Sequence, residues 1–113
     1  DDAAGAAGLQ VRQRLARPIT QALLGDAGAL RLRPVDPLIE EALRDAPLDP
    51  ELAGDILASI RAIDEPHPVL VTQPDVRRAL RRLVAPERPE VTVLSYFELD
   101  PEAPIERLET VAP

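Results

Sequence analysis

The chain has no cysteine and no lysine, and its only two aromatic residues are Tyr96 and Phe97. Without cysteine it forms no disulfide, no thiolate metal site and no cysteine nucleophile. Because aromatics are so few, leucine, valine, isoleucine and alanine must fill the interior. We expect one or both aromatic side chains to pack there as well, and the alternative is that one of them lines a partner groove. All 13 basic residues are arginine, which we interpret as the bias of a GC-rich genome.

Positive charge is also scarce, since the 13 arginines face 20 acidic residues and the formal net charge is -7. This balance argues against nucleic acid as a partner bound through bulk electrostatics. No apolar run is long enough to span a bilayer, and no signal peptide is visible. A length of 113 residues suits one ordinary domain or two very small ones. The opening DDAAGAAG lacks an initiator methionine and indicates a fragment of a longer protein.

The first quarter of the chain predicts a helical segment after a short tail. Residues 1–8 are rich in alanine and glycine, and we expect them to be disordered or a linker. Apolar residues then recur every four positions over Leu9–Leu24, a helical spacing, and Pro18 predicts a kink or break within it. The apolar positions are Val11, Leu15, Ile19 and Leu23. Gly25 and Gly28 mark a turn, and Ala29–Arg33 follows as a short strand.

Two Asp-Pro pairs predict the next two helices. Asp36 and Asp49 suit the N-cap position, and the proline after each suits the first helical position. We expect the first helix to end near Asp45. The second carries an apolar stripe made of Leu52, Ile56, Leu57, Ile60 and Ile63.

The stretch from Pro68 to Leu99 predicts a strand, a helix and a second strand. Val69–Val71 and Val91–Leu94 are short apolar runs typical of buried strands, and Pro74 with Asp75 marks the start of the helix between them. A crossover that carries a helix makes the two strands parallel. Residues 104–111 predict a final edge strand. The fold class is therefore α/β (or α+β), with an N-terminal helical segment before a small βαβ domain whose short sheet is mostly parallel.

Three segments resemble the C-terminal end of the export-gate proteins of bacterial type III secretion systems and of the related flagellar exporter. They are VRQRLARPI; LRPVDPLIEEALRDA followed by LDPELAGDIL; and PVLVTQPDVRRALRRLV with VTVLSYFEL. The last pair is the most specific, because motif, order and spacing all agree. The resemblance implies that residues 9–46 are the helical end of the family's third cytoplasmic subdomain and that residues 47–113 are the fourth.

The resemblance also implies a function. Export-gate cytoplasmic domains form a nine-membered ring at the cytoplasmic face of the bacterial inner membrane, below a multi-pass membrane part. The expected partners are other copies of the gate protein and the stalk protein of the export ATPase. Chaperone–substrate and gatekeeper complexes dock mainly on subdomains outside this chain. We therefore expect a non-enzymatic interaction module that supports protein secretion.

Four arginines of the predicted central helix are the candidate partner-binding residues: Arg77, Arg78, Arg81 and Arg82. Positions one and four apart share a broad helix face. One interpretation is a solvated face that is partly paired with Glu87, Glu90 or Glu98. The other is a docking patch for an acidic partner or a neighbouring subunit, which speeds association and selects the partner.

The remaining polar residues predict no catalytic, cofactor-binding or metal-binding site. His67 lies between two prolines and should be exposed, and Thr72 should help to cap the arginine-rich helix. The carboxylates Glu40, Glu41 and Glu51 lie near helix starts, where the helix dipole explains them. The alternative function is a small ligand-binding or enzymatic α/β domain. Its site would lie beyond the carboxyl ends of the strands, at Thr72-Gln73 and Ser95-Tyr96.

Overall fold

The computed structural model describes residues 29–45 and 47–113, and four strands and three α-helices follow one another there. In chain order they are β1 (Leu30–Pro34), α3 (Pro37–Arg44), α4 (Pro50–Arg61), β2 (Val69–Thr72), α5 (Arg77–Val84), β3 (Thr92–Ser95), the 3-10 helix η1 (Tyr96–Glu98) and β4 (Ile105–Arg107). The predicted tail over residues 1–8, the helix Leu9–Leu24 with its break at Pro18, and the turn at Gly25 and Gly28 lie outside the described residues.

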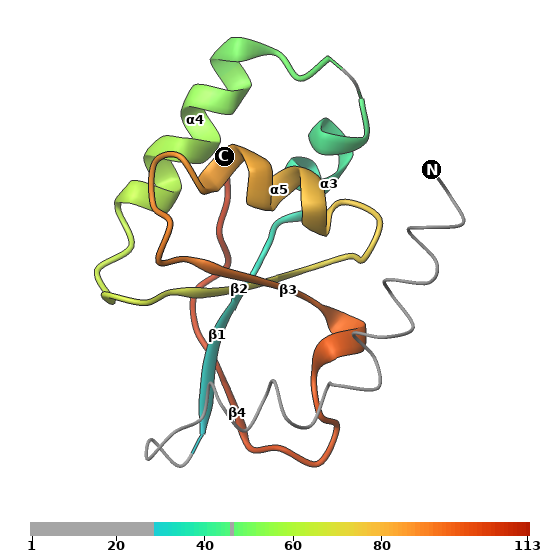
Figure 1. Ribbon diagram of the computed structural model, residues 1–113, viewed down its shortest axis with the longest axis vertical. Helices are drawn as coiled ribbons and strands as arrows, with labels where there is room; N and C mark the ends of the chain where they lie inside the picture. The colour runs from blue at the N-terminus through green and yellow to red at the C-terminus, as the bar shows by residue number, and fades with distance from the viewer. Residues whose placement is uncertain (1–28, 46) are drawn as a thin grey trace.

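The four strands form one parallel sheet in the order β3-β2-β1-β4 (Figure 1). Strands β2 and β3 pair in register from Val69 opposite Thr92 to Thr72 opposite Ser95, which confirms the predicted parallel pair. Strand β1 lies at the expected place and pairs with β2 on one side and with β4 on the other. The C-terminal strand is an edge strand as predicted, although it covers only three residues. The α/β class with a parallel sheet is thus confirmed.

The sheet joins residues from both sides of the predicted boundary between 46 and 47. Strand β1 belongs to the range 9–46, yet it lies between β2 and β4, which belong to 47–113. The described residues therefore share one sheet across that boundary. The assignment of the two ranges to the third and fourth subdomains of an export gate stays a prediction.

Both Asp-Pro predictions are confirmed. The Asp36 carboxylate accepts a hydrogen bond from the Leu38 N–H at 2.8 Å, and Pro37 opens α3. The Asp49 carboxylate accepts one from the Glu51 N–H at 3.2 Å, and Pro50 opens α4. Each aspartate thus satisfies a backbone donor that the first helical turn leaves without an intrahelical acceptor.

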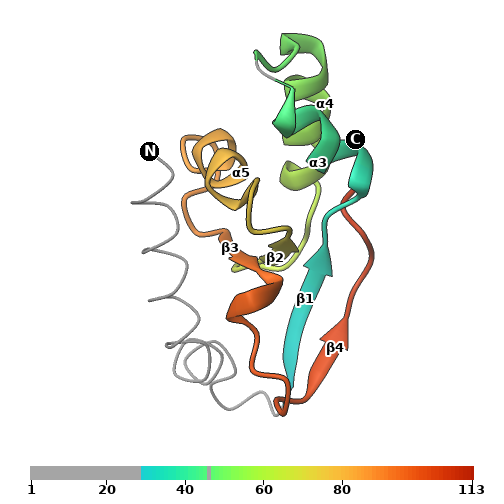
Figure 2. The ribbon, with the colours of Figure 1, turned by 90° about the vertical axis from the view of Figure 1, so that its right-hand side faces the viewer.

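Strands β2 and β3 alternate between two apolar faces, as the period of a strand requires. One face packs against α3, α4 and α5, which lie together on one side of the sheet (Figures 1 and 2). That core contains Val35, Ile39, Ile56, Ile60, Ile63, Leu70, Leu80, Val84, Val91, Val93 and Val111. The other face carries Leu30, Leu32, Val69, Val71 and Leu94, with Leu99 packed against them. Strand β2 is buried along its whole length, as its apolar sequence predicts.

Candidate partner-binding surface

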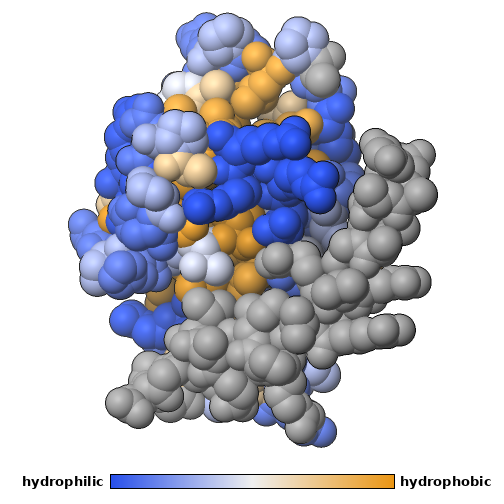
Figure 3. Space-filling view, in the orientation of Figure 1, coloured by the Kyte–Doolittle hydropathy of each residue, from blue (hydrophilic) through white to orange (hydrophobic). Residues whose placement is uncertain are grey.

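Helix α5 begins at Arg77, later than the Pro74-Asp75 start that the sequence predicted. Residues 74–76 form a turn instead, in which the Val76 N–H donates to the Gln73 carbonyl at 3.2 Å. The helix buries Leu80 and Val84 against the core, and it exposes Arg78 and Arg82. Figure 3 shows a band of hydrophilic side chains across the molecule over α5.

The four arginines fall into two pairs with different surroundings. Arg78 and Arg82 are exposed, and no described residue forms an ion pair or side-chain hydrogen bond with either of them. Arg77 and Arg81 are half-buried and lie against β3. The sequence placed all four on one face, whereas the structure separates an exposed pair from a pair engaged with the sheet.

Arg77 and Arg81 hold the outer edge of β3. The Arg81 guanidinium donates to the Val91 carbonyl at 3.0 Å, and that of Arg77 donates to the Val93 carbonyl at 3.2 Å. Four residues of helix rise about 6.0 Å and two residues of strand rise about 6.6 Å, so both contacts form at once. The strand is at the edge of the sheet, and its outward carbonyls are satisfied by a helix of the same domain.

Of the three expected acidic partners, only Glu98 meets this cluster. The Arg77 Nε lies 3.6 Å from an oxygen of Glu98, whose side chain is fully buried. The same Glu98 oxygen accepts a hydrogen bond from the Ser95 N–H at 3.0 Å. The other two candidates, Glu87 and Glu90, pair with arginines outside the cluster. Glu87 lies 3.1 Å from Arg61 and Glu90 lies 2.9 Å from Arg88, which lowers the pKa of Glu90.

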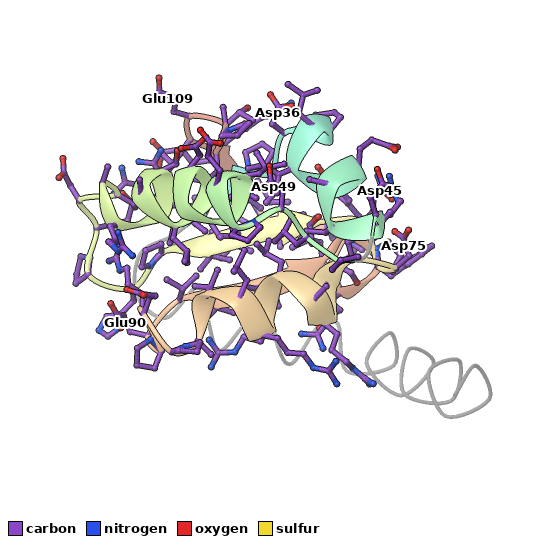
Figure 4. The ribbon with its side chains drawn as sticks, turned by 90° about the horizontal axis from the view of Figure 1, so that it is seen from above. Asp36, Asp45, Asp49, Asp75, Glu90 and Glu109 are labelled. Atoms are coloured by element: carbon purple, nitrogen blue, oxygen red, sulfur yellow. The ribbon has the colours of Figure 1, made fainter. Side chains whose placement is uncertain are left out.

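Helix α3 fixes the turn that leads into α5. One oxygen of Glu40 accepts hydrogen bonds from the Thr72 hydroxyl at 2.7 Å and from the Gln73 N–H at 2.8 Å. One helical turn later, Arg44 donates to both oxygens of Asp75, at 2.6 and 3.2 Å. This bidentate contact lowers the pKa of Asp75 and raises that of Arg44. Figure 4 shows Asp75 near the end of α3 and Asp36 at its start.

These contacts correct two sequence predictions. Thr72 does not cap α5, since its hydroxyl donates to Glu40 and the N-cap residue Val76 makes no side-chain cap bond. The helix dipole alone does not explain Glu40, which is buried and joined to the end of β2. Glu41 and Glu51 are exposed near their helix starts, as expected.

A second set of arginine contacts joins α4 to the chain after α5. Arg88 donates to the carbonyls of Ile60 and Ile63, at 2.8 and 3.0 Å, and to that of Glu65 at 3.0 Å. The Glu65 side chain in turn accepts two hydrogen bonds from Arg33 of β1, at 2.7 and 3.0 Å. This pair lowers the pKa of Glu65 and raises that of Arg33. The two ends of α5 are thus held by α3 on one side and α4 on the other.

The two aromatic residues do not pack in the interior, contrary to the prediction. Tyr96 is 46% exposed and Phe97 is 52% exposed on the short helix η1, while Glu98 of the same turn is fully buried. The sequence signal was the S-x-x-E pattern of Ser95 and Glu98, in which a glutamate folds back onto the N-cap backbone. Because Glu98 also contacts Arg77, η1 lies beside the start of α5.

His67 is exposed, as predicted. Thr72 and Ser95 end adjacent strands and are both fully buried, so the strand ends present little to a ligand. Within residues 29–45 and 47–113, no three histidine or carboxylate side chains are placed to bind a metal ion. No helix of this part of the chain is long and apolar enough to cross a membrane.

Fold and surface together define a small parallel α/β domain that presents a rigidly held cationic helix. The FHIPEP family, the family of the type III export gate, matches residues 6–104, and the chain belongs to this family. It is 33% identical over 118 residues to the flagellar biosynthesis protein FlhA of Caulobacter vibrioides, covering 90% of this chain and 16% of that protein.

Solved structures of export-gate cytoplasmic domains share the fold. The CdsV protein of Chlamydia pneumoniae matches with a TM-score of 0.81 at 33% identity, over 92% of this chain and 34% of that one. CdsV has also been solved in complex with CdsO. The nonameric EscV cytosolic domain of a type III secretion system matches with a TM-score of 0.76 at 26% identity, over 92% of this chain and 35% of that one. The chain thus spans about a third of these structures.

Proposed function

We propose that the chain is a non-enzymatic interaction module in the cytoplasmic ring of a type III protein export gate, at the inner face of the bacterial inner membrane. Its partners are other copies of the gate protein and the stalk protein of the export ATPase. Chaperone–substrate and gatekeeper complexes bind mainly to parts of the gate outside this chain. The observation that carries the proposal is the exposed pair Arg78 and Arg82 on a helix fixed at both ends, in a member of the export-gate family.

Physical chemistry supports a docking role for this pair. The chain as a whole carries a net charge of -7, so a local cationic patch selects an acidic surface against the background of the molecule. Such a patch acts mainly on the association rate and on the choice of partner. The half-buried Arg77 and Arg81 hold the helix against β3. Because the backbone of Arg78 and Arg82 is therefore ordered before a partner binds, binding loses less conformational entropy.

The relatives are consistent with this proposal. CdsV forms a complex with CdsO, and the EscV cytosolic domain is nonameric. Binding a different protein and binding further copies of the same protein both require exposed surface residues. The α5 surface of Arg78 and Arg82 is therefore a candidate for either the neighbouring gate subunit or the stalk protein.

Charge reversal of the exposed pair tests the proposal. The double variant Arg78→Glu/Arg82→Glu should associate with the purified stalk protein about tenfold more slowly at low salt, with a smaller difference at high salt. Biolayer interferometry measures the rates. The matched control is Arg61→Glu, which reverses an exposed arginine of α4 whose surface ion pair contributes little. If the double variant keeps its fold and associates as fast as the control, Arg78 and Arg82 do not dock the stalk protein.

A further inference from the structure

The two edge strands of the sheet, β3 and β4, differ in whether their outward backbone groups are hydrogen-bonded within the domain. Along β3, the Val91 N–H donates to the Arg88 carbonyl at 3.1 Å. Arg81 and Arg77 then donate to the next two outward carbonyls, and the Ser95 N–H donates to Glu98. An edge strand normally offers such groups to another chain. On β3 the N–H and C=O of Val91, the C=O of Val93 and the N–H of Ser95 are already bonded within the domain, so most of this edge is unavailable to a further strand.

Strand β4 forms the opposite edge, and its outward groups are open. The Leu30 N–H donates to the Pro104 carbonyl at 2.8 Å, and the Leu108 N–H donates to the Leu32 carbonyl at 2.7 Å. In a parallel ladder with this register, Glu106 directs its backbone groups to β1. The N–H and C=O of Ile105 and Arg107 therefore point away from the sheet.

The surroundings of β4 leave this edge accessible. All three of its residues are exposed, including Ile105 at 44%. No hydrogen bond from a described side chain reaches the backbone of Ile105 or Arg107, in contrast to the capped carbonyls of β3. Figure 2 shows β4 at the side of the molecule away from α5, so this edge is distinct from the arginine surface. Four outward backbone groups on two alternate residues match what one added strand requires.

We propose that β4 is a docking edge for an extended segment of a partner protein, which adds a fifth strand to the sheet. The side chains of β4 define the chemistry of that segment. Glu106 lies opposite Arg31 of β1, with 3.3 Å between Nε and Oε2, so a lysine or arginine across Glu106 extends an alternating ladder of charges. An apolar residue fits beside the exposed Ile105, and an acidic residue fits beside Arg107.

A second copy of this chain fits the edge poorly. The antiparallel arrangement that uses all the outward groups pairs Ile105 of one copy with Arg107 of the other. It also places the two Glu106 side chains directly opposite each other, and like charges in that position are destabilising. A partner strand with a central basic residue avoids this repulsion. The occupant is therefore a heterologous extended peptide segment of the apolar–basic–acidic type.

Nuclear magnetic resonance with two synthetic peptides tests the proposal on the 113-residue chain. The first peptide has the central sequence Val-Lys-Glu between threonines, and the second exchanges the lysine and the glutamate, so that both have the same composition. At millimolar concentration the first peptide should slow hydrogen exchange of the Ile105 and Arg107 amides. The exchanged peptide should bind about two- to fivefold more weakly, because it places glutamate against Glu106.

Three variants separate the backbone contribution from the side-chain contribution. Arg107→Pro removes an outward N–H and keeps the Glu106 and Leu108 donors to β1, so it should abolish binding, whereas Arg107→Ala should retain it. The double variant Glu106→Gln/Arg107→Ala, which removes both charges that face the exchanged positions, should bind both peptides equally. The proposal is overturned if saturating peptide leaves both amides unprotected, or if folded Arg107→Pro binds as well as Arg107→Ala. It is also overturned if the double variant Glu106→Gln/Arg107→Ala still discriminates between the peptides. None of these outcomes depends on the α5 surface.

Discussion

Replacing Arg77 or Arg81 by alanine tests whether these arginines hold the edge of the sheet. A hydrogen bond from a charged donor contributes about 1.5–3 kcal/mol to stability, with the lower end suited to half-buried groups. Arg81 makes one short contact with the Val91 carbonyl, so Arg81→Ala should lower the free energy of unfolding by about 1.5 kcal/mol.

Arg77 has the larger expected effect because its removal also affects Glu98. The Arg77 side chain is 20% exposed, and Glu98 is fully buried at 3.6 Å from it. Removing one partner of a buried ion pair costs about 3–5 kcal/mol in the worst case. Glu98 keeps its hydrogen bond from the Ser95 N–H, which reduces this cost. We therefore expect Arg77→Ala to lower the free energy of unfolding by about 2–3 kcal/mol.

Urea unfolding followed by far-UV circular dichroism measures these differences, and the adjacent arginines provide the control. Arg78→Ala and Arg82→Ala remove exposed side chains from the same helix, and each should change stability by no more than about 0.5 kcal/mol. Alanine favours a helix at least as well as arginine does, so propensity does not obscure the comparison. Equal losses for Arg77→Ala and Arg78→Ala would refute the division of the cluster into a structural pair and an exposed pair.

Two further predictions concern the carboxylates that hold other elements. Glu40→Ala should cost about 2 kcal/mol, because the buried Thr72 hydroxyl and the Gln73 N–H lose their acceptor, whereas Glu40→Gln should cost much less because one amide oxygen can accept both. Urea unfolding that finds the same loss for both variants would contradict this. The folded-state pKa values of Glu65 and Asp75 are lowered by Arg33 and Arg44. Their stabilisation is therefore complete above the unfolded-state pKa values, near 4, and is lost as the pH falls through the lower folded-state values. The variant Glu65→Gln/Asp75→Asn should show a flatter fall of the urea midpoint below about pH 4, and an unchanged slope would refute the assignment.

The parts of the fold set by local chemistry were predicted correctly from the sequence. Asp36 and Asp49 cap their helices because the necessary donor lies two residues away in the chain. The apolar runs of β2 and β3 were also predicted correctly. A continuous apolar run indicates a strand buried on both faces, whichever elements pack against it. The family resemblance added what these local patterns do not contain, namely the kind of protein in which the domain occurs.

Features that depend on strand order were not predictable. The role of Arg77 and Arg81 follows from β3 being an edge strand, which requires the order β3-β2-β1-β4. The contact between Arg44 and Asp75, in the turn before α5, joins residues 31 positions apart. Tyr96 and Phe97 were placed in the core on apolarity alone, and the competing fold-back of Glu98 turned them outward.

The arginine contacts between α5 and β3 have a consequence for the length of that helix. From one arginine contact to the next, the helix advances four residues and the strand advances two residues. These two distances differ by about 0.6 Å. Two contacts tolerate this difference, but a third and a fourth would be displaced by about 1.2 and 1.8 Å. A longer helix with arginine at every fourth position would therefore slide out of step with the strand. The eight residues of α5 are long enough for two such contacts and short enough to avoid that drift. An insertion between Arg77 and Arg81 should therefore break one of their two contacts with β3.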